Sequence, residues 1–318
     1  MIRNREWIAR VEAVHRLARI AAVIPTRGRV ITTAYYSEST LVNEAPSRPE
    51  PARKRQAREE RQVEERSGLR TPVIYEIVRK RGDEEMARPT TSLWWSGVAA
   101  GMSMSFSLLT QAILLTTLPD APWRHLVISA GYSVGFLMVI LGGQQLFTEN
   151  TITAVLPLMK DFTIRNIWRL SRLWTIVWVA NMVGTLFAAY FCTWTPVITP
   201  ELRDAMLQVS GELMKNGWVE MFFRAIAAGF LVAATVWLIP GAESAKFWVI
   251  SLFTFLIGAG GFAHIVAGSV EAFLLIANGQ LDVVTMLAGF MIPTLLGNIV
   301  GGTALFALIS YAQVMEEI

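Results

Sequence analysis

Six long apolar segments follow Pro89 in this chain of 318 residues. Each approaches or exceeds the roughly 20 residues that a helix needs to cross the hydrocarbon core of a bilayer. The pattern therefore predicts an all-α membrane protein with six spans. The expected spans are residues 92–117, 126–159, 172–193, 218–240, 247–277 and 281–314.

Two of these spans are interrupted by glycines and polar residues. The second contains GGQQLFTEN at residues 142–150, and the fifth contains GAGGFAHIVAGS at residues 258–269. Backbone that leaves helical geometry at membrane depth has no water to satisfy it, so it persists only where it is buried in protein or lines a wet cavity. The two breaks therefore predict a permeation pathway.

The breaks fall in the middle helices of two successive groups of three spans, which is the arrangement of an inverted repeat. The third span of each group carries the same pattern, Ala180-Asn181-Met182-Val183-Gly184 in the first and Gly297-Asn298-Ile299-Val300-Gly301 in the second. A polar side chain inside an apolar helix needs a partner, and small residues let another helix approach closely. We expect Asn181 and Asn298 to be structural residues that join helices.

The part of the chain before Pro89 has a different character. Residues 1–70 are expected to be a basic, largely disordered cytoplasmic tail, within which residues 2–24 are either a membrane-surface helix or an untethered segment and residues 43–65 a linker or solvated helix. Residues 71–88 are expected to form an amphipathic helix beneath the membrane, with Thr71 as its N-cap and Pro72 in its first turn. Residues 89–318 then form the six-span channel domain.

Composition and charge support this division. The hydrophobic fraction is 53%, the charged fraction 17% and the mean hydropathy +0.43, whereas soluble domains carry about 25% charge. Residues 1–88 hold 19 of the 28 Lys and Arg residues and 13 of the 25 Asp and Glu residues, so the net positive charge belongs to this part. By the positive-inside rule, the tail and the basic connection at residues 160–172 are cytoplasmic, and both termini are therefore cytoplasmic.

His264 is the strongest candidate for chemistry, because it is the only one of the 3 histidines in the apolar interior. An ionisable residue inside the membrane is a functional candidate by default. Thr148 lies at the other break, and the two residues would face one another in an inverted repeat. A hydroxyl and an imidazole there are able to bind a small anion together.

Three further charged residues lie near the pathway. Lys246, 18 positions before His264, either attracts anions at the cytoplasmic end of the fifth span or snorkels there. Glu149 and Glu271 flank the breaks, where each either tunes the histidine or is solvated at a pore mouth. A carboxylate beside an anion pathway repels its cargo, which argues against a direct role.

Signals for catalysis, metal binding and nucleic-acid binding are weak. GAGGFA at residues 258–263 formally matches a dinucleotide motif but lacks the surrounding strands, and the sequence contains neither a P-loop nor a zinc-protease motif. The single cysteine, Cys192, excludes an intramolecular disulfide. The sequence shows no basic folded face with aromatic residues, which nucleic-acid binding would need. We predict no enzyme activity, no cofactor and no metal site.

Residues 88–311 resemble the formate/nitrite transporter family. The resemblance rests on Leu146-Phe147-Thr148 in the first break, Gly261-Phe262 and His264 in the second, Lys246 at the family's spacing, and the Gly297–Gly302 run after Pro293. It implies an aquaporin-like fold, a homopentamer in the inner membrane with one pore in each protomer, and passage of small monovalent anions or their weak acids. It places apolar constrictions at Tyr132, Phe136, Leu146, Phe147, Val232, Ile257 and Phe262.

The chain departs from the family pattern at four polar positions, which are occupied by Gln145, Ala263, Gly229 and Gly268. The main hypothesis is therefore a channel for a small anion or weak acid, with Thr148 and His264 at its centre. Two other hypotheses stay open. One is an aquaporin-like pore for a small neutral solute, and the other is a non-conducting membrane scaffold or regulator that acts through its basic tail.

Overall fold

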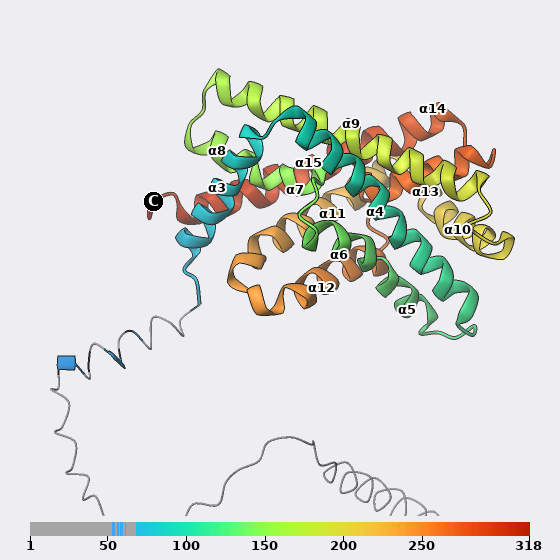
Figure 1. Cartoon of the computed structure of the whole chain (residues 1–318), viewed down its shortest axis with the longest axis horizontal. Coiled ribbons are helices and arrows are strands. Elements are labelled where there is room, and N and C mark those ends of the chain that lie inside the picture. Colours follow the sequence, from blue (N-terminus) through green and yellow to red (C-terminus); the bar gives the residue numbers. More distant parts are fainter. Residues whose placement is uncertain (1–52, 55, 57, 60, 62–67) are drawn as a thin grey trace, which may run out of the picture. The chain divides into compact units, whose positions relative to one another are not determined.

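The computed structural model describes residues 53–54, 56, 58–59, 61 and 68–318. The chain divides into two units, Met1–Arg61 and Gln62–Ile318. The described residues of the first unit are helical and exposed. The predictions for residues 2–24 and for most of 43–65 lie outside the described residues, and the account below concerns the second unit (Figure 1).

All regular elements in the described part of the chain are helices. The first half contains α3 (Thr71–Ala87), α4 (Thr90–Thr117), α5 (Arg124–Gly131), α6 (Ser133–Leu141), α7 (Phe147–Thr153), α8 (Val155–Lys160) and α9 (Ile164–Trp194). After α10 (Pro200–Leu213), the second half contains α11 (Trp218–Leu238), the short turns η1 (Ile239–Gly241) and η2 (Glu243–Ala245), α12 (Lys246–Ala259) and α13 (Ile265–Ala277). The last span comprises α14 (Val283–Thr285), η3 (Met286–Met291), α15 (Ile292–Ile299), η4 (Val300–Ala307) and α16 (Leu308–Val314).

The helices match the predicted spans, including the interruptions. Five helical stretches in the described part are long and apolar enough to cross a membrane, namely residues 90–117, 124–141, 164–194, 218–241 and 283–314. The predicted fifth span is divided into α12 and α13, of 14 and 13 residues, so neither half is long enough to cross alone. The last span contains two π-helical segments, η3 and η4, on either side of α15, which carries Pro293 in its first turn.

The two breaks have the same backbone geometry. In each, a glycine with φ of +61°, Gly143 or Gly261, ends the preceding helix. The next residue returns a hydrogen bond five positions back, from Gln144 N–H to Val139 O and from Phe262 N–H to Ile257 O. Glycine favours this left-handed cap because it has no Cβ to clash. The cap also provides hydrogen-bond donors for carbonyls that would otherwise be buried without partners.

Close helix packing uses small residues in both repeats. Gly97 and Gly101 lie against α9, because an added Cβ at Gly101 would stand 2.2 Å from the Asn181 carbonyl oxygen. Gly297 and Gly301 lie in the same way against α11. Figure 1 shows α4 running beside α9, and α11 packs along α15 and η4. In both repeats the first and third spans are thus joined by close glycine contacts.

Helix α3 is docked on the helical bundle. Its buried residues face α7, α8, α9 and α16, and the Tyr75 and Tyr311 rings lie 5.9 Å apart between α3 and α16. Gly82 permits this contact, because a Cβ there would stand 1.8 Å from the Thr153 carbonyl oxygen. The prediction of Thr71 as N-cap was wrong: Arg70 is the N-cap, in extended conformation and without a side-chain cap, and Thr71 is the first helical residue. Pro72 fits either register, since the early N–H groups of a helix lack intrahelical partners.

Candidate functional site

The breaks bring Thr148 and His264 together. Thr148 lies in the first turn of α7, His264 is the N-cap of α13, and Thr148 Oγ1 lies 2.7 Å from His264 Nε2. Both side chains are buried, with exposures of 0% and 1%. The two candidate residues therefore meet where the broken spans of the two repeats meet.

Backbone geometry fixes the tautomer of His264. The Ala267 N–H donates to Nδ1 at 3.2 Å, as in a side-chain cap at a helix N-terminus. Nδ1 must then hold a lone pair, so the neutral imidazole carries its proton on Nε2 and donates it to Thr148 Oγ1. The Thr148 hydroxyl is left with its own proton, which it is able to donate to a bound solute.

Aromatic rings cover this pair on one side. The Phe136 ring meets the imidazole edge-on, with centroids 4.9 Å apart, and the Tyr132 ring lies 5.4 Å from that of Phe136. Both rings come from the predicted second span. They place apolar surface directly beside the buried imidazole. A charged solute in contact with His264 would therefore lose hydrating water and contact apolar rings instead.

The other predicted constriction residues divide into three groups. Ile257 and Phe262 line a cavity together with Tyr132, whereas Leu146 and Val232 are buried in the core. Phe147 points elsewhere, because its ring packs edge-on against Trp174 of α9 at 5.7 Å.

Lys246 is the first residue of α12 and interacts electrostatically with Glu149. The structure does not place Lys246 with Thr148 and His264.

Asn181 and Asn298 hold the two break loops in place. Asn181 Oδ1 accepts the Phe147 N–H at 2.9 Å, and its Nδ2 donates to the carbonyls of Gly97 and Gln145 at 2.8 and 2.9 Å. Asn298 does the same for the Ile265 N–H and for the carbonyls of Ala225 and Ala263, at 2.8, 2.8 and 3.0 Å. Each break is therefore held by a single side-chain amide at the start of its second half-helix.

Three of the positions that depart from the family pattern are in close contact with neighbouring backbone or side chains. Gln145 is buried and its Oε1 accepts from Asn150 Nδ2 at 3.1 Å, so its amide is directed along the break loop. Gly229 lies against the Asn298 backbone, where a Cβ would stand 2.4 Å from the carbonyl oxygen. Gly268 lies against the Phe290 ring and Leu213. Larger polar side chains at these two glycines would need the neighbouring helices to move.

Glu149 pairs with a residue that the sequence did not single out. Arg81 of α3 donates to Glu149 Oε2 and to Glu85 Oε1, each at 3.0 Å, and Thr153 donates to Glu85 Oε2 at 2.6 Å. The Glu149 side chain is 3% exposed and paired with Arg81, so it is not solvated at a pore mouth. The spacing of Arg81 and Glu85 on the predicted helix was the available signal, but the partner on α7 is 68 positions away.

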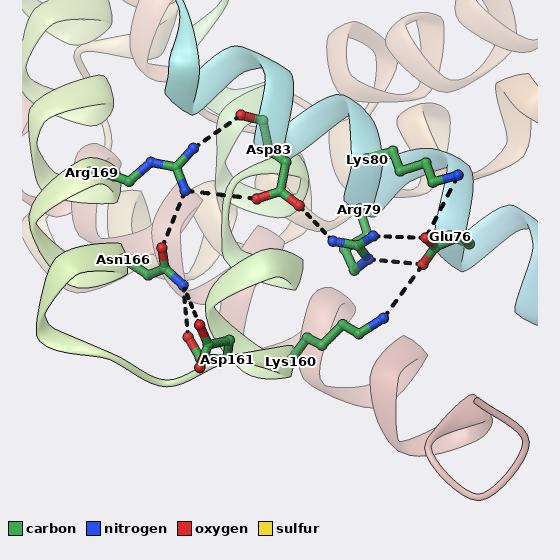
Figure 2. A network of polar contacts seen from close by, with 8 residues as sticks. All are labelled: Glu76, Arg79, Lys80, Asp83, Lys160, Asp161, Asn166 and Arg169. Carbon is green, nitrogen blue, oxygen red and sulfur yellow. Dashed lines mark hydrogen bonds and ion pairs between the residues drawn. The ribbon is translucent and has the colours of Figure 1, made fainter.

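A second ionic network ties α3 to the α8–α9 region (Figure 2). Arg79 donates to both carboxylate oxygens of Glu76, at 2.8 and 2.7 Å, and to Asp83 at 2.5 Å. Arg169 of α9 donates to the Asp83 carbonyl at 3.2 Å, and Lys160 of α8 lies 4.0 Å from Glu76. The hydrogen bonds from Arg79 hold the pKa of Glu76 below its ordinary value.

A cavity of about 490 Å³ lies between α10 and the second break. We call it the α10 chamber. It is lined by Tyr132 of the second span, by Ile257 and Phe262 at the second break, and by Glu271 of α13. The remaining lining residues come from α4, α5, α10, α11, α12, the connection between α10 and α11, and the second break, and they include Gln111, His125, Glu212, Lys215 and Arg224.

Comparison with known proteins identifies the family to which the chain is similar. The model of the formate/nitrite transporter family matches residues 72–312. The inner membrane protein YfdC of Escherichia coli (strain K12) is 44% identical over 254 residues, which are 80% of this chain and 82% of that protein. A probable formate transporter of Methanothermobacter thermautotrophicus is 32% identical over 213 residues, which are 60% of this chain and 76% of that protein.

Two solved structures share the fold. One is a pentameric formate channel with formate bound, with a TM-score of 0.63 at 21% identity, and the match covers 72% of this chain and 98% of that channel. The other is an ion channel of the same family, with a TM-score of 0.65 at 22% identity, covering 76% and 98%. These likenesses confirm the predicted all-α, aquaporin-like fold with two broken spans. The named functions are those of transporters and channels, in agreement with the prediction that the chain is not an enzyme.

Proposed function

This chain belongs to the formate/nitrite transporter family, and from that premise we propose that it forms a homopentameric channel for a small monovalent anion or the corresponding weak acid. A pentameric formate channel of the same fold supports the assembly and the class of solute. The inner-membrane relative and the basic residues before the first span support an inner-membrane location with both termini cytoplasmic.

The contact between Thr148 and His264 carries the proposal. It is a buried hydrogen-bonding pair at the junction of the two breaks, next to the rings of Phe136 and Tyr132. An unpaired charge in such surroundings costs several kcal/mol even after the protein relaxes, on the order of the penalties measured for buried ions. A solute that arrives as an anion and crosses the rings as a neutral acid avoids most of this cost.

The resting hydrogen bonds suit a solute that is first bound and then protonated. Thr148 donates its free proton to an oxygen of the anion, while its own oxygen accepts from His264 Nε2. For the imidazole to become a cation, Nδ1 must also take a proton and give up the Ala267 N–H. The negative charge of the bound anion offsets that loss, and the imidazolium is then able to pass a proton to the anion.

An aquaporin-like pore for a small neutral solute is the second candidate. The observation that favours it is the packing at Gly229 and Gly268, where helix backbone and the Phe290 ring occupy positions that are polar in the family. A pathway with fewer polar groups gives an anion less compensation for lost hydration.

A flux panel on the purified protein in liposomes separates the two candidates. Formate, nitrite, acetate, lactate, hydrosulfide and cyanate are compared at two pH values with uncharged solutes tested by stopped-flow swelling. The channel proposal predicts saturable or pH-dependent flux of at least one weak acid above that of empty liposomes. Swelling with uncharged solutes and no flux of any weak acid would favour the neutral pore, and cross-linking that gives no pentamer would contradict the assembly.

A further inference from the structure

The beginning of α9 carries large apolar side chains that the rest of the described chain does not cover. Ile164 is 82% exposed, Phe162 in the connection before it is 77% exposed, and Trp168 is 70% exposed. The first two values are the highest among the large apolar side chains of the described residues. A cluster of exposed apolar surface of this kind marks a contact with another molecule.

The length of α9 places this cluster among lipid headgroups. Its 31 residues correspond to about 46 Å of helix, whereas the hydrocarbon core of a bilayer is about 30 Å thick and the whole bilayer about 40–45 Å. The other end of α9 carries Trp194, which is 71% exposed, and the Tyr190 ring lies 4.4 Å from it. Such an aromatic pair is typical of a membrane–water interface. The first turns of α9 therefore lie at the headgroup layer of the opposite leaflet.

Two arginines lie on the same side of α9 as the apolar side chains. Ile164, Trp168 and Arg172 follow one another at intervals of four residues, which is close to one helical turn. Arg165 lies only about 60° further round the helix than Trp168. The buried residues of these turns are on the other side, against the helical bundle. The outward side of the first turns is therefore both apolar and basic.

The two arginines are not neutralised by acids of the described chain. Arg165 is exposed, and its side chain makes no hydrogen bond or ion pair with the described residues. Arg172 donates to two backbone carbonyls at the end of α3, each at 3.0 Å, and to no described carboxylate. Lys160 and Arg169 are instead paired with acids of α3 (Figure 2). Asp161 is the one acid of this region, and its carboxylate already accepts an amide N–H at 3.3 Å.

We propose that Arg165, Trp168 and Arg172 form a binding site for an anionic phospholipid of the leaflet in which α9 begins. The guanidinium groups donate to the phosphate and to other ionised oxygens of the headgroup. Trp168, Ile164 and Phe162 insert among the neighbouring headgroups. A zwitterionic lipid offers the same apolar contact but carries a cation of its own, so it is attracted less. A soluble phosphate would leave the apolar side chains in water.

Quenching of tryptophan fluorescence by brominated lipids in nanodiscs tests this site. The full-length protein is reconstituted in equimolar phosphatidylglycerol and phosphatidylcholine, with bromine on the acyl chains of one lipid or of the other, so that the membrane composition stays constant. The difference between wild type and Trp168→Phe isolates the quenching at Trp168. A basic side chain near the membrane surface favours an anionic lipid by about fivefold. Because several lipids surround one indole, quenching at Trp168 should be at least about twofold stronger with brominated phosphatidylglycerol, and high salt should reduce this preference.

Two charge variants make the test specific. Arg165→Gln removes a positive charge from the site, and the preference of Trp168 for phosphatidylglycerol should fall toward equality with phosphatidylcholine. The fold of this variant is not at risk, because the Arg165 side chain is exposed and has no partner among the described residues. Lys80→Gln is the control, since it removes a positive charge from α3, where the lysine side chain is 67% exposed. The preference of Trp168 should be the same in Lys80→Gln as in wild type.

Three outcomes would overturn the proposal. Equal quenching of Trp168 by the two brominated lipids would mean that this surface contacts lipid without selecting its charge. The absence of quenching at Trp168 by either lipid would mean that protein covers the surface, for example a second copy of the chain. An unchanged preference in Arg165→Gln would exclude that arginine from the site. None of these measurements depends on conduction, so the site is tested independently of the proposed channel function.

Discussion

Asn181 and Asn298 make the same set of hydrogen bonds in opposite halves of the molecule. Each accepts a backbone N–H at the start of a half-helix, from Phe147 or Ile265, and each donates to two carbonyls. Both side chains are fully buried. The two repeats are therefore related by the way each break is held, as well as by helix order.

Replacing either asparagine should destabilise the fold strongly. Asn181→Ala and Asn298→Ala each leave a buried N–H and two buried carbonyls without their partner, and each unsatisfied group costs about 1–3 kcal/mol. Because the losses overlap, we expect about 2–4 kcal/mol for each variant. Thermal melting in detergent measures the effect. Asn278→Ala is the control, since Asn278 is only partly buried at the end of α13, and equal shifts in all three variants would contradict this account.

Gly82 should be required for docking of α3. A Cβ at this position would stand 1.8 Å from the Thr153 carbonyl oxygen, so Gly82→Ala must push α3 away from α7. We expect a longer and broader distance between spin labels on α3 and on the α8–α9 connection, introduced by Lys80→Cys and Phe162→Cys in a Cys192→Ala background. Gly211→Ala has open space and should leave the distance unchanged. An unchanged distance in Gly82→Ala would show that α3 is not held by this contact.

Arg81 should stabilise the fold through Glu149. Arg81→Met leaves the carboxylate of Glu149, whose side chain is 3% exposed, without its ion-pair partner. Loss of one partner from a fully buried pair costs about 3–5 kcal/mol, and because Arg81 is 39% exposed we expect about 2 kcal/mol. Adding Glu149→Gln should recover part of the loss, because Glu85 also loses its ion pair with Arg81 but keeps the hydrogen bond from Thr153. The control is Lys80→Met, whose exposed ion pair should contribute less than about 1 kcal/mol, and strictly additive losses in the double variant would argue against coupling.

Docking of α3 should also weaken in acid. The pKa of Glu76 lies below its ordinary value of 4.5 because Arg79 donates to its carboxylate. Stabilisation from a carboxylate with a lowered pKa is complete above the ordinary value and is lost as the pH falls through the lowered one. The same spin-label distance should therefore stay constant from pH 7 to about pH 5 and broaden below about pH 4. Glu76→Gln should show the acid-like distance at pH 7, and a pH response identical to wild type in that variant would assign the effect to another group.

Much of the fold follows from the sequence, because its signals are local. The GG pairs at 142–143 and 260–261 interrupt apolar segments, and the structure turns them into identical left-handed caps. The asparagine pattern in the third span of each group indicated helix contacts, and the structure shows what each amide binds. The N-cap of α3 was misplaced by one residue, because the preference of threonine for that position is worth only about 1 kcal/mol.

The contacts between residues far apart in the sequence were predictable only in part. The pairing of Arg81 with Glu149 joins positions 68 apart, and that of Thr148 with His264 joins positions 116 apart. The inverted repeat indicated that the second pair would face one another, but the cap from Ala267 N–H that sets the imidazole tautomer requires coordinates. Glu149 and Glu271 were two acids near the breaks that the sequence did not distinguish, and the structure pairs Glu149 with Arg81 and places Glu271 in the lining of the α10 chamber.

The pH dependence of flux through His264 variants tests the central claim most directly. His264→Asn retains a side chain able to cap α13 but has no group that titrates, so the fold should survive. His264→Ala and His264→Phe remove the cap as well. Measured in proteoliposomes from pH 5 to 8, wild-type flux of a transported weak acid should change with pH as the imidazole titrates, and all three variants should have altered profiles. Wild-type pH profiles in the variants would contradict the assignment of Thr148 and His264 as the central site.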